Sequence, residues 1–371
     1  MKFNVNQKDL QNSLNFCQGV IEKKSTLPIL SNVLLRAQDE ILKVTATDLD
    51  LIFIHQIENV EILEEGNTTT TSSIMFDIVR KFSSDKKLNL SMNSENKLQL
   101  ESEKSIFNLN CINSSEFPLT DENFNDNTFT INSKHFLKLL NKCKFSISND
   151  ETRHYLSGIY FHQTEVEDKI YLTAVATDSH RMSISKIRLS EKINFDPIIL
   201  PKKTIFQLCS LLDNYDGDLK ISNLKSKIKF ELTNSILISK LIDGKFPNYV
   251  QVIPKNNQKK LETNLKSFLG SIDRVASVSL DKKDGVKFKL SKDTLNLSVN
   301  NTTSGDGNET LGVQFSTFQE IYRVSDRIMT DIIESETFPT IEEISTKDNL
   351  FGYKVKYNVN EVFFYSPFQE H

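Results

Sequence analysis

The stretch that organises this chain reads Ala176-Thr177-Asp178-Ser179-His180-Arg181-Met182. It follows an alternating apolar run, Ile170 to Val175, which predicts a β-strand. An earlier strand-like run leads into Ala46-Thr47-Asp48, with no Ser, His or Arg directly after the Asp. The shared Ala-Thr-Asp therefore predicts a common turn, whereas His180 and Arg181 are additions to one copy. A feature that occurs in one copy only indicates where to look for function.

Other landmarks also recur, at intervals of about 130 residues, which is the size of a small domain. Three times an Asn suited to an N-cap precedes an amphipathic helix, at Asn6, Asn132 and Asn264. A second helix is expected in each copy, at Ser72 to Phe82, Pro201 to Leu212 and Phe318 to Ile333. The predicted fold class is α+β, with three tandem domains of two helices packed on antiparallel sheets. Their expected bounds are 1–125, 126–254 and 255–371.

Composition narrows the function classes. The chain has 371 residues, 38% of them hydrophobic and 25% charged, which is typical of a soluble globular protein. A net charge of −4 argues against a simple basic nucleic-acid binder. The four cysteines, Cys17, Cys111, Cys143 and Cys209, have spacing that suits neither a zinc site nor a disulfide framework. With no signal peptide and no membrane-length apolar run, we expect a cytoplasmic protein without metal or cofactor.

Positive charge gathers on the predicted helices. Lys134, Lys138 and Lys142 recur at every fourth residue, opposite the apolar face of their helix. Further helical Lys and Arg residues occur in all three copies: Lys8, Arg80, Lys81, Lys202, Lys203, Lys266 and Arg274. In an acidic protein this distribution predicts helices that face one polyanion, with acidic strands and loops elsewhere.

Four motifs in combination resemble the bacterial DNA polymerase III beta subunits, the sliding clamps. They are Thr26 to Leu30, Ala46 to Asp48, Ala176 to Met182, and Asp243 to Tyr249. The resemblance implies a homodimer that closes head to tail into a ring around double-stranded DNA. It implies no catalysis, cofactor or membrane. The implied partners are the alpha subunit of the replicative polymerase, the clamp loader, repair polymerases and mismatch-repair proteins, all through clamp-binding peptides.

The resemblance also implies site residues. It assigns a peptide pocket to Arg153, Leu156, Thr177, His180, Arg181, Met182, Pro247 and Val252. It assigns DNA-facing positions to Lys24, Arg80, Tyr155 and Lys202, which join the helical Lys134, Lys138 and Lys142. It sets Phe107 and Leu109 of the first domain against Val278 of the third, across the protomer interface. Ser179 stands where the family commonly has Gly, and Gln251 where a basic residue is common.

Two other functions are compatible with parts of the sequence. A hydrolase could use Asp178, Ser179 and His180, although adjacent residues rarely point toward one another as a catalytic set requires. The other is a clamp-fold scaffold with defective ring closure or pocket, because the recognisable motifs end near residue 310. The chain lacks the Met-Pro-Met-Arg-like tail of the family, so the pocket wall would come from Phe363 to Phe368 and bind peptides more weakly.

Overall fold

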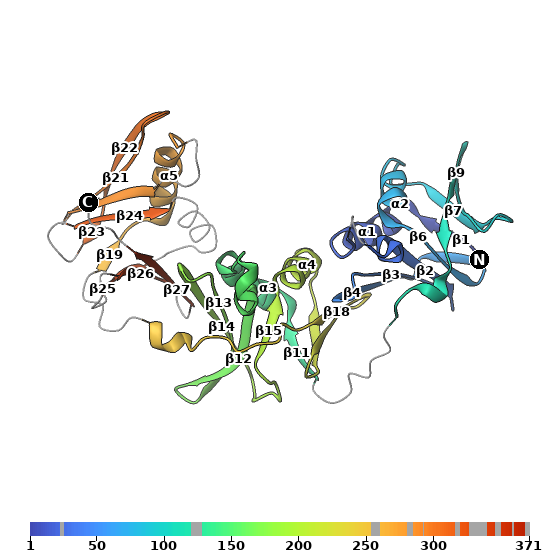
Figure 1. Cartoon of the computed structure of the whole chain (residues 1–371), viewed down its shortest axis with the longest axis horizontal. Helices are drawn as coiled ribbons and strands as arrows, with labels where there is room; N and C mark the ends of the chain where they lie inside the picture. Colours follow the sequence, from blue (N-terminus) through green and yellow to red (C-terminus); the bar gives the residue numbers. More distant parts are fainter. Residues whose placement is uncertain are drawn as a thin grey trace. The chain divides into compact units, whose positions relative to one another are not determined.

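The computed structural model describes residues 1–22, 26–119, 128–253, 260–279, 285–291, 293–315, 320–325, 340–345, 350–357 and 360–367. The chain divides into two compact units. Figure 1 labels the helices and strands of both units and colours them along the sequence. Unit 1 comprises 1–137, 193–196 and 203–242, and unit 2 comprises the remainder. The middle copy of the repeat therefore contributes to both units.

Unit 1 contains a five-stranded sheet of order β5-β1-β7-β8-β9 and a nine-stranded sheet of order β10-β6-β2-β3-β4-β18-β17-β16-β11. The first copy supplies β1 (Lys2–Asn6), α1 (Gln7–Gln18), β2 (Asn32–Gln38), β3 (Ile41–Thr47), β4 (Leu51–Ile57), β5 (Val60–Glu64), β6 (Gly66–Thr71), α2 (Ser72–Val79), β7 (Lys87–Met92), β8 (Leu98–Ser102), β9 (Ser105–Leu109) and β10 (Cys111–Ile112). The second copy supplies β11 (Thr128–Asn132), α4 (Lys202–Leu212), β16 (Asp218–Asn223), β17 (Lys227–Glu231) and β18 (Ser235–Lys240).

Unit 2 contains a nine-stranded sheet of order β15-β12-β13-β14-β27-β26-β25-β19-β23 and a four-stranded sheet of order β22-β21-β20-β24. The second copy supplies most of α3 (Ser133–Cys143), then β12 (Gly158–Val166), β13 (Lys169–Thr177), β14 (Arg181–Arg188) and β15 (Ile198–Pro201). The third copy supplies β19 (Lys260–Glu262), α5 (Leu265–Ala276), β20 (Gly285–Leu290), β21 (Thr294–Asn301), β22 (Gly305–Gly312), β23 (Gln314–Phe315), β24 (Glu320–Ser325), β25 (Thr340–Ser345), β26 (Leu350–Tyr357) and β27 (Asn360–Pro367).

Strands β1 and β7 of the five-stranded sheet bury alternate residues, as a sheet with one face on a core requires. In β1 the buried residues are Phe3 and Val5, and in β7 they are Leu88 and Leu90. The amphipathic α1 covers its sheet with Leu10 and Leu14, both fully buried. The helices and strands expected for the first two copies are confirmed, and all ladders between strands of the described chain are antiparallel.

The expected Asn caps are confirmed at two of three positions. Oδ1 of Asn132 accepts hydrogen bonds from the backbone N–H groups of Lys134 and His135, at 3.1 and 3.2 Å. Oδ1 of Asn264 likewise accepts from Ser267, at 3.1 Å. Asn6 precedes α1 but caps no backbone N–H, because its side-chain amide turns to Asp9 instead.

The helix expected over Phe318 to Ile333 is wrong where the structure describes it. Glu320–Ser325 forms β24, which pairs with β20 and sets Val324 opposite Val286. Ile321, Tyr322 and Val324 are β-branched or aromatic types, which favour strands over helices. Residues 318–319 and 326–333 of the expected helix lie outside the described ranges.

Two ladders cross from one copy of the repeat to the next. In unit 1, β4 of the first copy pairs with β18 of the second, and Phe53 stands opposite Leu237. In unit 2, β14 of the second copy pairs with β27 of the third, and Ser183 stands opposite Val362. Both sheets are therefore continuous between neighbouring copies.

Candidate peptide pocket and DNA-facing residues

The turn between β13 and β14 is built by the side chains of Thr177 and Asp178. Oδ1 of Asp178 accepts hydrogen bonds from the N–H groups of His180 and Arg181, at 3.0 and 2.9 Å. Oγ1 of Thr177 accepts from the N–H of Ser179 at 3.1 Å and donates to the carbonyl of Arg181 at 2.7 Å. These bonds force Ser179 into the left-handed region, with a φ of 75°.

The first copy builds the same turn between β3 and β4. Oδ1 of Asp48 accepts from the N–H groups of Asp50 and Leu51 at 3.0 and 2.6 Å, and Thr47 accepts from Leu49 at 3.0 Å. Leu49 takes the place of Ser179, with a φ of 79°. The shared Thr-Asp pair is therefore structural, as the sequence predicts. Its hydrogen bonds fix the backbone of the residues that follow it in each turn.

Two arginines from different elements meet at the second-copy turn. Arg181 donates from Nε to Oδ2 of Asp178 at 3.1 Å, and its guanidinium lies 5.5 Å from the centre of the Phe145 ring. Arg153 donates from Nη1 to Oγ of Ser179 at 2.6 Å and from Nε to Asp150 at 2.7 Å. The turn therefore carries two arginines that are held in place by ion pairs with Asp150 and Asp178.

These contacts leave no catalytic set. The Ser179 hydroxyl accepts from Arg153, and both carboxylate oxygens of Asp178 hold the turn and Arg181. His180 is exposed, and it bonds through its backbone N–H to Asp178, not through its ring to Ser179. The hydrolase alternative therefore has no geometric support in the described residues.

The apolar residues assigned to the pocket divide into two classes. Leu156 and Met182 are buried, with 3% and 1% of their surface exposed. Pro247 is exposed, and Val252 is 51% exposed. The backbone of β27 lies beside this place, because Met182 stands opposite Phe363 and Arg181 opposite Phe364. The C-terminal strand is thus next to β14, where the expected pocket wall requires it.

Sequence reasoning missed the contacts that hold Pro247 and Val252 in place. The ring of Phe246 stacks on Tyr160 of β12 at 4.8 Å, and Tyr160 stacks on His162 at 4.8 Å. Nε2 of His162 lies 2.9 Å from the hydroxyl of Tyr249. Two features of the sequence could have predicted these contacts. Phe246 and Tyr249 lie on either side of Pro247, and Tyr160 and His162 lie two positions apart on one strand.

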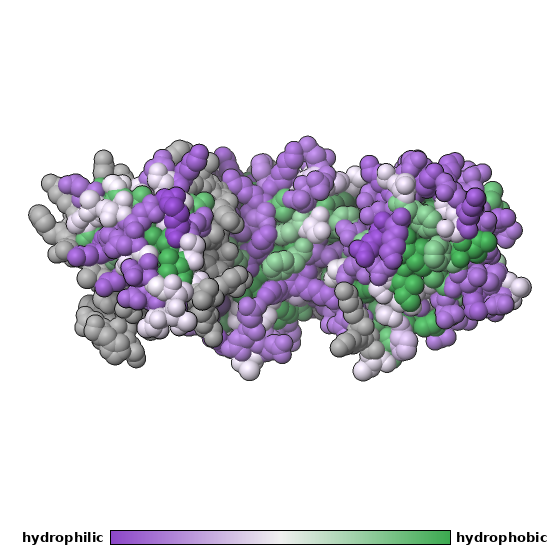
Figure 2. Space-filling view, turned by 90° about the horizontal axis from the view of Figure 1, so that it is seen from above, coloured by the Kyte–Doolittle hydropathy of each residue, from purple (hydrophilic) through white to green (hydrophobic). Residues whose placement is uncertain are grey.

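The cations expected to face DNA differ in exposure. Lys134 and Lys138 are exposed, and Lys134 pairs with Asp216 at 2.6 Å. Arg80 is exposed at the end of α2 and pairs with Asp77 at 3.0 Å. Figure 2 shows that the surface of the described residues in this view is mostly hydrophilic, with smaller groups of hydrophobic residues.

The other four residues assigned to face DNA are Lys202, Tyr155, Lys24 and Lys142. Lys202 is half-buried and its Nζ donates to the side chain of Asn149, while Tyr155 is half-buried beside His154. Lys24 lies outside the described residues. The expectation that Lys142 belongs to an exposed stripe with Lys134 and Lys138 is wrong, because Lys142 is only 4% exposed. An α-helix has 3.6 residues per turn, so a side chain eight residues after Lys134 points about 80° away from the direction of Lys134. This rotation turns Lys142 toward the packed face of the helix.

The residues expected at the protomer interface differ in their exposure to solvent. Phe107 is 37% exposed and its neighbour Ile106 is 56% exposed, on β9 at the end of the five-stranded sheet. Leu109 is 7% exposed and so packs within its own sheet. Val278 is half-buried against Gly307, where an added Cβ would lie 2.9 Å from its Cγ2.

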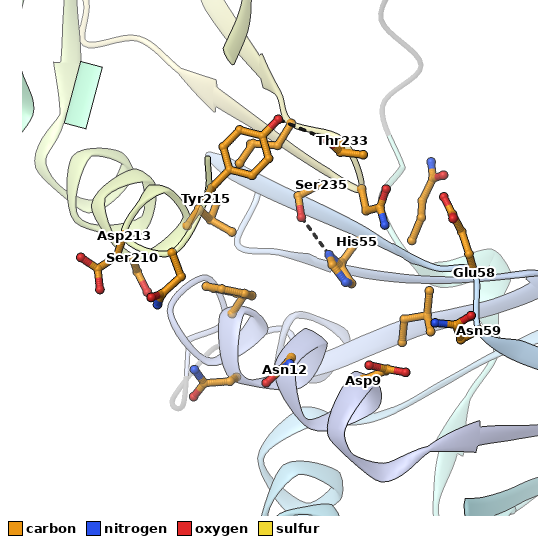
Figure 3. Close-up of a pocket in the computed structure, with 18 of the residues that line it drawn as sticks. Asp9, Asn12, His55, Glu58, Asn59, Ser210, Asp213, Tyr215, Thr233 and Ser235 are labelled. Carbon is orange, nitrogen blue, oxygen red and sulfur yellow. Dashed lines mark hydrogen bonds between the residues drawn. The ribbon is translucent and has the colours of Figure 1, made fainter. Parts of the chain in front are cut away.

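A cavity of about 710 Å³ lies elsewhere, in unit 1, between α1, α4 and the β4–β18 ladder (Figure 3). Its lining includes Asp9, Glu58 and Asp213, and His55, whose Nδ1 lies 2.8 Å from Oγ of Ser235. Burial lowers the pKa of His55, and Asp9 partly opposes this shift. Among the described residues no group of three or more His, Cys, Asp or Glu side chains could hold a metal ion. The same part of the chain has no helix long and apolar enough to cross a membrane.

Comparison with protein families matches three domain models along this chain. The DNA polymerase III beta subunit N-terminal domain matches residues 1–121, the central domain residues 130–248, and the C-terminal domain residues 250–341. The third match runs past residue 310, where recognisable motifs end. This counts against the alternative of a clamp-fold scaffold whose ring closure or pocket is defective because of a divergent C-terminus.

Similar proteins carry the same description. The beta sliding clamp of Caulobacter vibrioides is 32% identical over 85% of this chain and 85% of its own length. That of Rickettsia felis is 36% identical over 84% of this chain and 82% of its own length. The structure resembles a sliding clamp from Bartonella birtlesii bound to griselimycin, with TM-score 0.91 and 30% identity, covering 98% of each chain. A clamp from Bacillus subtilis, at 22% identity, shares the fold with TM-score 0.90 over 100% of both chains.

Proposed function

Because this chain belongs to the family of DNA polymerase III beta subunits, the beta sliding clamps, we propose that two copies of it close into a ring around duplex DNA. As a member of the family it is a non-catalytic processivity factor that tethers polymerases. The ring slides without sequence specificity, since phosphate contacts carry no base information. We retain 1–125, 126–254 and 255–371 as its domains, and we propose the cytoplasm as its location because bacterial DNA lies there.

The observation that supports ring closure is that the same kind of strand ladder joins neighbouring copies of the repeat twice. Both β4 and β14 follow the Thr-Asp turn, and each pairs with the last strand of the next copy. Phe53 and Ser183 are the third residues of their strands, and so are their partners Leu237 and Val362. The two junctions therefore share one register.

One counterpart of each strand in these junctions lies at the end of its sheet in the described chain. These are β22, the counterpart of β4 and β14, and β9, the counterpart of β18 and β27. In the third copy β22 follows the turn of Asn301, whose Oδ1 accepts from Thr303 and Ser304 as Asp48 and Asp178 do in theirs. In the first copy β9 takes the place of β18 and β27. Pairing β22 of one chain with β9 of a second repeats the internal junction, and two such contacts close a ring.

The shared register identifies the residues that meet. The third residue of β9 is Phe107 and that of β22 is Gly307, so they stand opposite each other. Val278 already packs on Gly307. The proposed pairing therefore brings Phe107 of the second chain close to Val278. An exposed strand edge with Ile106 and Phe107 is otherwise prone to uncontrolled pairing, which the second chain prevents.

Solution mass tests this function. Light scattering is expected to give twice the chain mass of 42.5 kDa at micromolar concentration. Phe107→Asp buries an unpaired charge in the junction and is expected to give monomers. Leu63→Asp is the matched control, because Leu63 is 49% exposed on β5, at the other end of the same sheet. Leu109→Asp is unsuitable, because Leu109 is buried within the single chain and its replacement tests folding.

A monomeric wild-type protein would contradict closure, as would equal effects of the Phe107 and Leu63 substitutions. An unchanged dimer for Phe107→Asp would move the interface away from β9. Circular dichroism of each variant separates loss of assembly from loss of fold.

Replication partners dock, in this proposal, on the pocket of unit 2. Arg153, His180 and Arg181 supply its polar rim, Leu156 and Met182 support it from beneath, and Pro247 and Val252 project into solvent. The backbone of β27 runs along its edge. This combination of apolar anchor and charged rim suits a short peptide with an aromatic or aliphatic end. The proposed partners are the polymerase alpha subunit, the clamp loader, repair polymerases and mismatch-repair proteins.

A further inference from the structure

The segment that carries Pro247 and Val252 is fastened to β12 at two points. Phe246 is only 6% exposed and lies parallel to the Tyr160 ring, with an angle of 5° between the planes. Three residues later the hydroxyl of Tyr249 meets Nε2 of His162 at 2.9 Å. Tyr160 and His162 stack on each other, so the two fastening points share one aromatic column.

The proton positions in this contact follow from its partners. Nδ1 of His162 lies 3.1 Å from the carbonyl oxygen of Gln163, which can only accept, so Nδ1 carries the proton. Nε2 is then an acceptor, and the Tyr249 hydroxyl donates to it. Burial lowers the pKa of His162, and burial with the nearby Tyr160 raises the pKa of Tyr249 to about 12. Both groups are therefore neutral at physiological pH, as this bond requires.

Between and beyond the two fastening points the chain presents apolar side chains to water. Pro247 is exposed, and Val250 and Val252 are 52% and 51% exposed. The backbone between them is a tight turn, in which the N–H of Tyr249 donates to the carbonyl of Pro247 at 2.8 Å. The orientation of this turn relative to β12 is set by Phe246 and Tyr249.

We propose that His162 and Tyr249 form a latch that fixes the Pro247–Val252 wall of the peptide pocket, and that the latch sets peptide affinity without touching the peptide. This inference rests on the proposed function of the pocket. A wall that is fixed before binding loses less conformational entropy when the peptide docks. His162 and Tyr249 are thus positioning residues. Neither belongs to the set of residues assigned to the pocket.

The experiment titrates a fluorescently labelled clamp-binding peptide against the full-length protein and four variants. Tyr249→Phe removes the hydroxyl alone, and His162→Ala removes its acceptor. His162→Gln is the conservative variant, because its amide oxygen can accept at about the place of Nε2. Tyr171→Phe, at a half-buried tyrosine of the neighbouring strand β13, is the matched control. Thermal midpoint and dimer mass are measured for each protein.

Tyr249→Phe and His162→Ala are expected to weaken peptide binding about three- to tenfold, the worth of one hydrogen bond. His162→Gln is expected to recover at least half of the loss, and Tyr171→Phe to match the wild type. Dimer mass is expected to stay constant throughout.

Variants that melt earlier yet bind the peptide with wild-type affinity would overturn the latch while leaving the pocket intact. Failure of His162→Gln to bind better than His162→Ala would also overturn it, because the acceptor would then have no role. A wild-type protein that binds no peptide would overturn the pocket itself, and with it any effect of the latch on affinity.

Discussion

At the scale of single residues, one turn position stores backbone strain in two copies. Leu49 and Ser179 both have φ near 75–79°, because the same Thr-Asp hydrogen bonds shape both turns. A residue with a Cβ is disfavoured there, and Gly is not. The two positions differ in a side-chain hydrogen bond: Ser179 accepts one from Arg153, whereas the apolar side chain of Leu49 cannot and is 44% exposed.

Replacing each residue by Gly separates strain from that contact. Leu49→Gly is expected to raise the free energy of unfolding by about 0.5–1 kcal/mol, since relief of strain exceeds the added unfolded-state entropy. Ser179→Gly is expected to gain less, because it also deletes the acceptor of the Arg153 bond. Denaturant titration of the two variants measures the difference. Equal gains at both positions would show that the Arg153–Ser179 bond adds no stability.

Two half-buried histidines make the fold sensitive to mild acid. Burial lowers the pKa of His55 and of His162, and Lys186 adds to the shift at His162. The unfolded chain then binds protons below about pH 6.5, where the folded chain does not. Stability is therefore complete above that pH and falls as the pH drops toward the lower folded pKa.

The thermal midpoint is thus expected to decrease as the pH falls below about 6.5. His55→Gln is expected to flatten part of this decrease by removing one of the two groups. His135→Gln, at an exposed histidine of α3, is the control and is expected to leave the decrease unchanged. A decrease that is identical in all three proteins would contradict the role of His55.

At the scale of elements, α3 shows how one helix divides charge between solvent and core. Its apolar residues Phe136, Leu139 and Leu140 are buried, and Lys134 and Lys138 point away from them. Lys142 belongs to the same sequence pattern yet is buried near Cys143. The helix therefore offers two lysines, not three, to a polyanion.

This division predicts different salt dependences for two variants of α3. Lys138→Ala is expected to lower the slope of log affinity for duplex DNA against log salt by about one. Lys142→Ala is expected to leave the slope unchanged and to lower the thermal midpoint instead. Binding of a short labelled duplex at several salt concentrations gives both slopes. Equal slopes for Lys138→Ala and the wild type would remove α3 from the DNA-facing surface.

At the scale of the whole molecule, a ring retains DNA by enclosure, so that individual contacts can stay weak. The exposed cations Arg80 and Lys134 already pair with Asp77 and Asp216, which moderates their attraction for phosphates. Weak, interchangeable contacts permit sliding, and the proposed closure through the β9 and β22 edges would prevent escape.

Protein loaded on a nicked circular DNA is therefore expected to stay bound at a salt concentration that abolishes duplex binding. Cutting the circle is expected to release it, since the ring then slides off the end. Phe107→Asp, which opens the proposed junction, is expected to be lost from intact circles. Gel filtration of the DNA fraction before and after cutting measures retention. Protein that remains on the linear product would contradict enclosure.

The sequence by itself determined the repeat, its helices and its turns. Amphipathic periods, Asn caps and the Thr-Asp turn depend on residues a few positions apart, so local chemistry decides them. The structure confirms the helices after Asn132 and Asn264 and the common turn at Asp48 and Asp178. Local reasoning failed for Phe318 to Ile333, where pairing with β20 makes a strand of Glu320–Ser325.

Tertiary structure alone decided which distant strands meet and which side chains remain in water. The β4–β18 and β14–β27 ladders join strands nearly two hundred residues apart, and backbone hydrogen bonds between such strands leave no mark in sequence spacing. Burial of Lys142, Leu109 and Met182 depends on what packs over each element. The His162–Tyr249 bond likewise joins residues that are separate in sequence, because a loop folds back across β12. A side chain's type is local information, whereas its neighbours are a property of the whole fold.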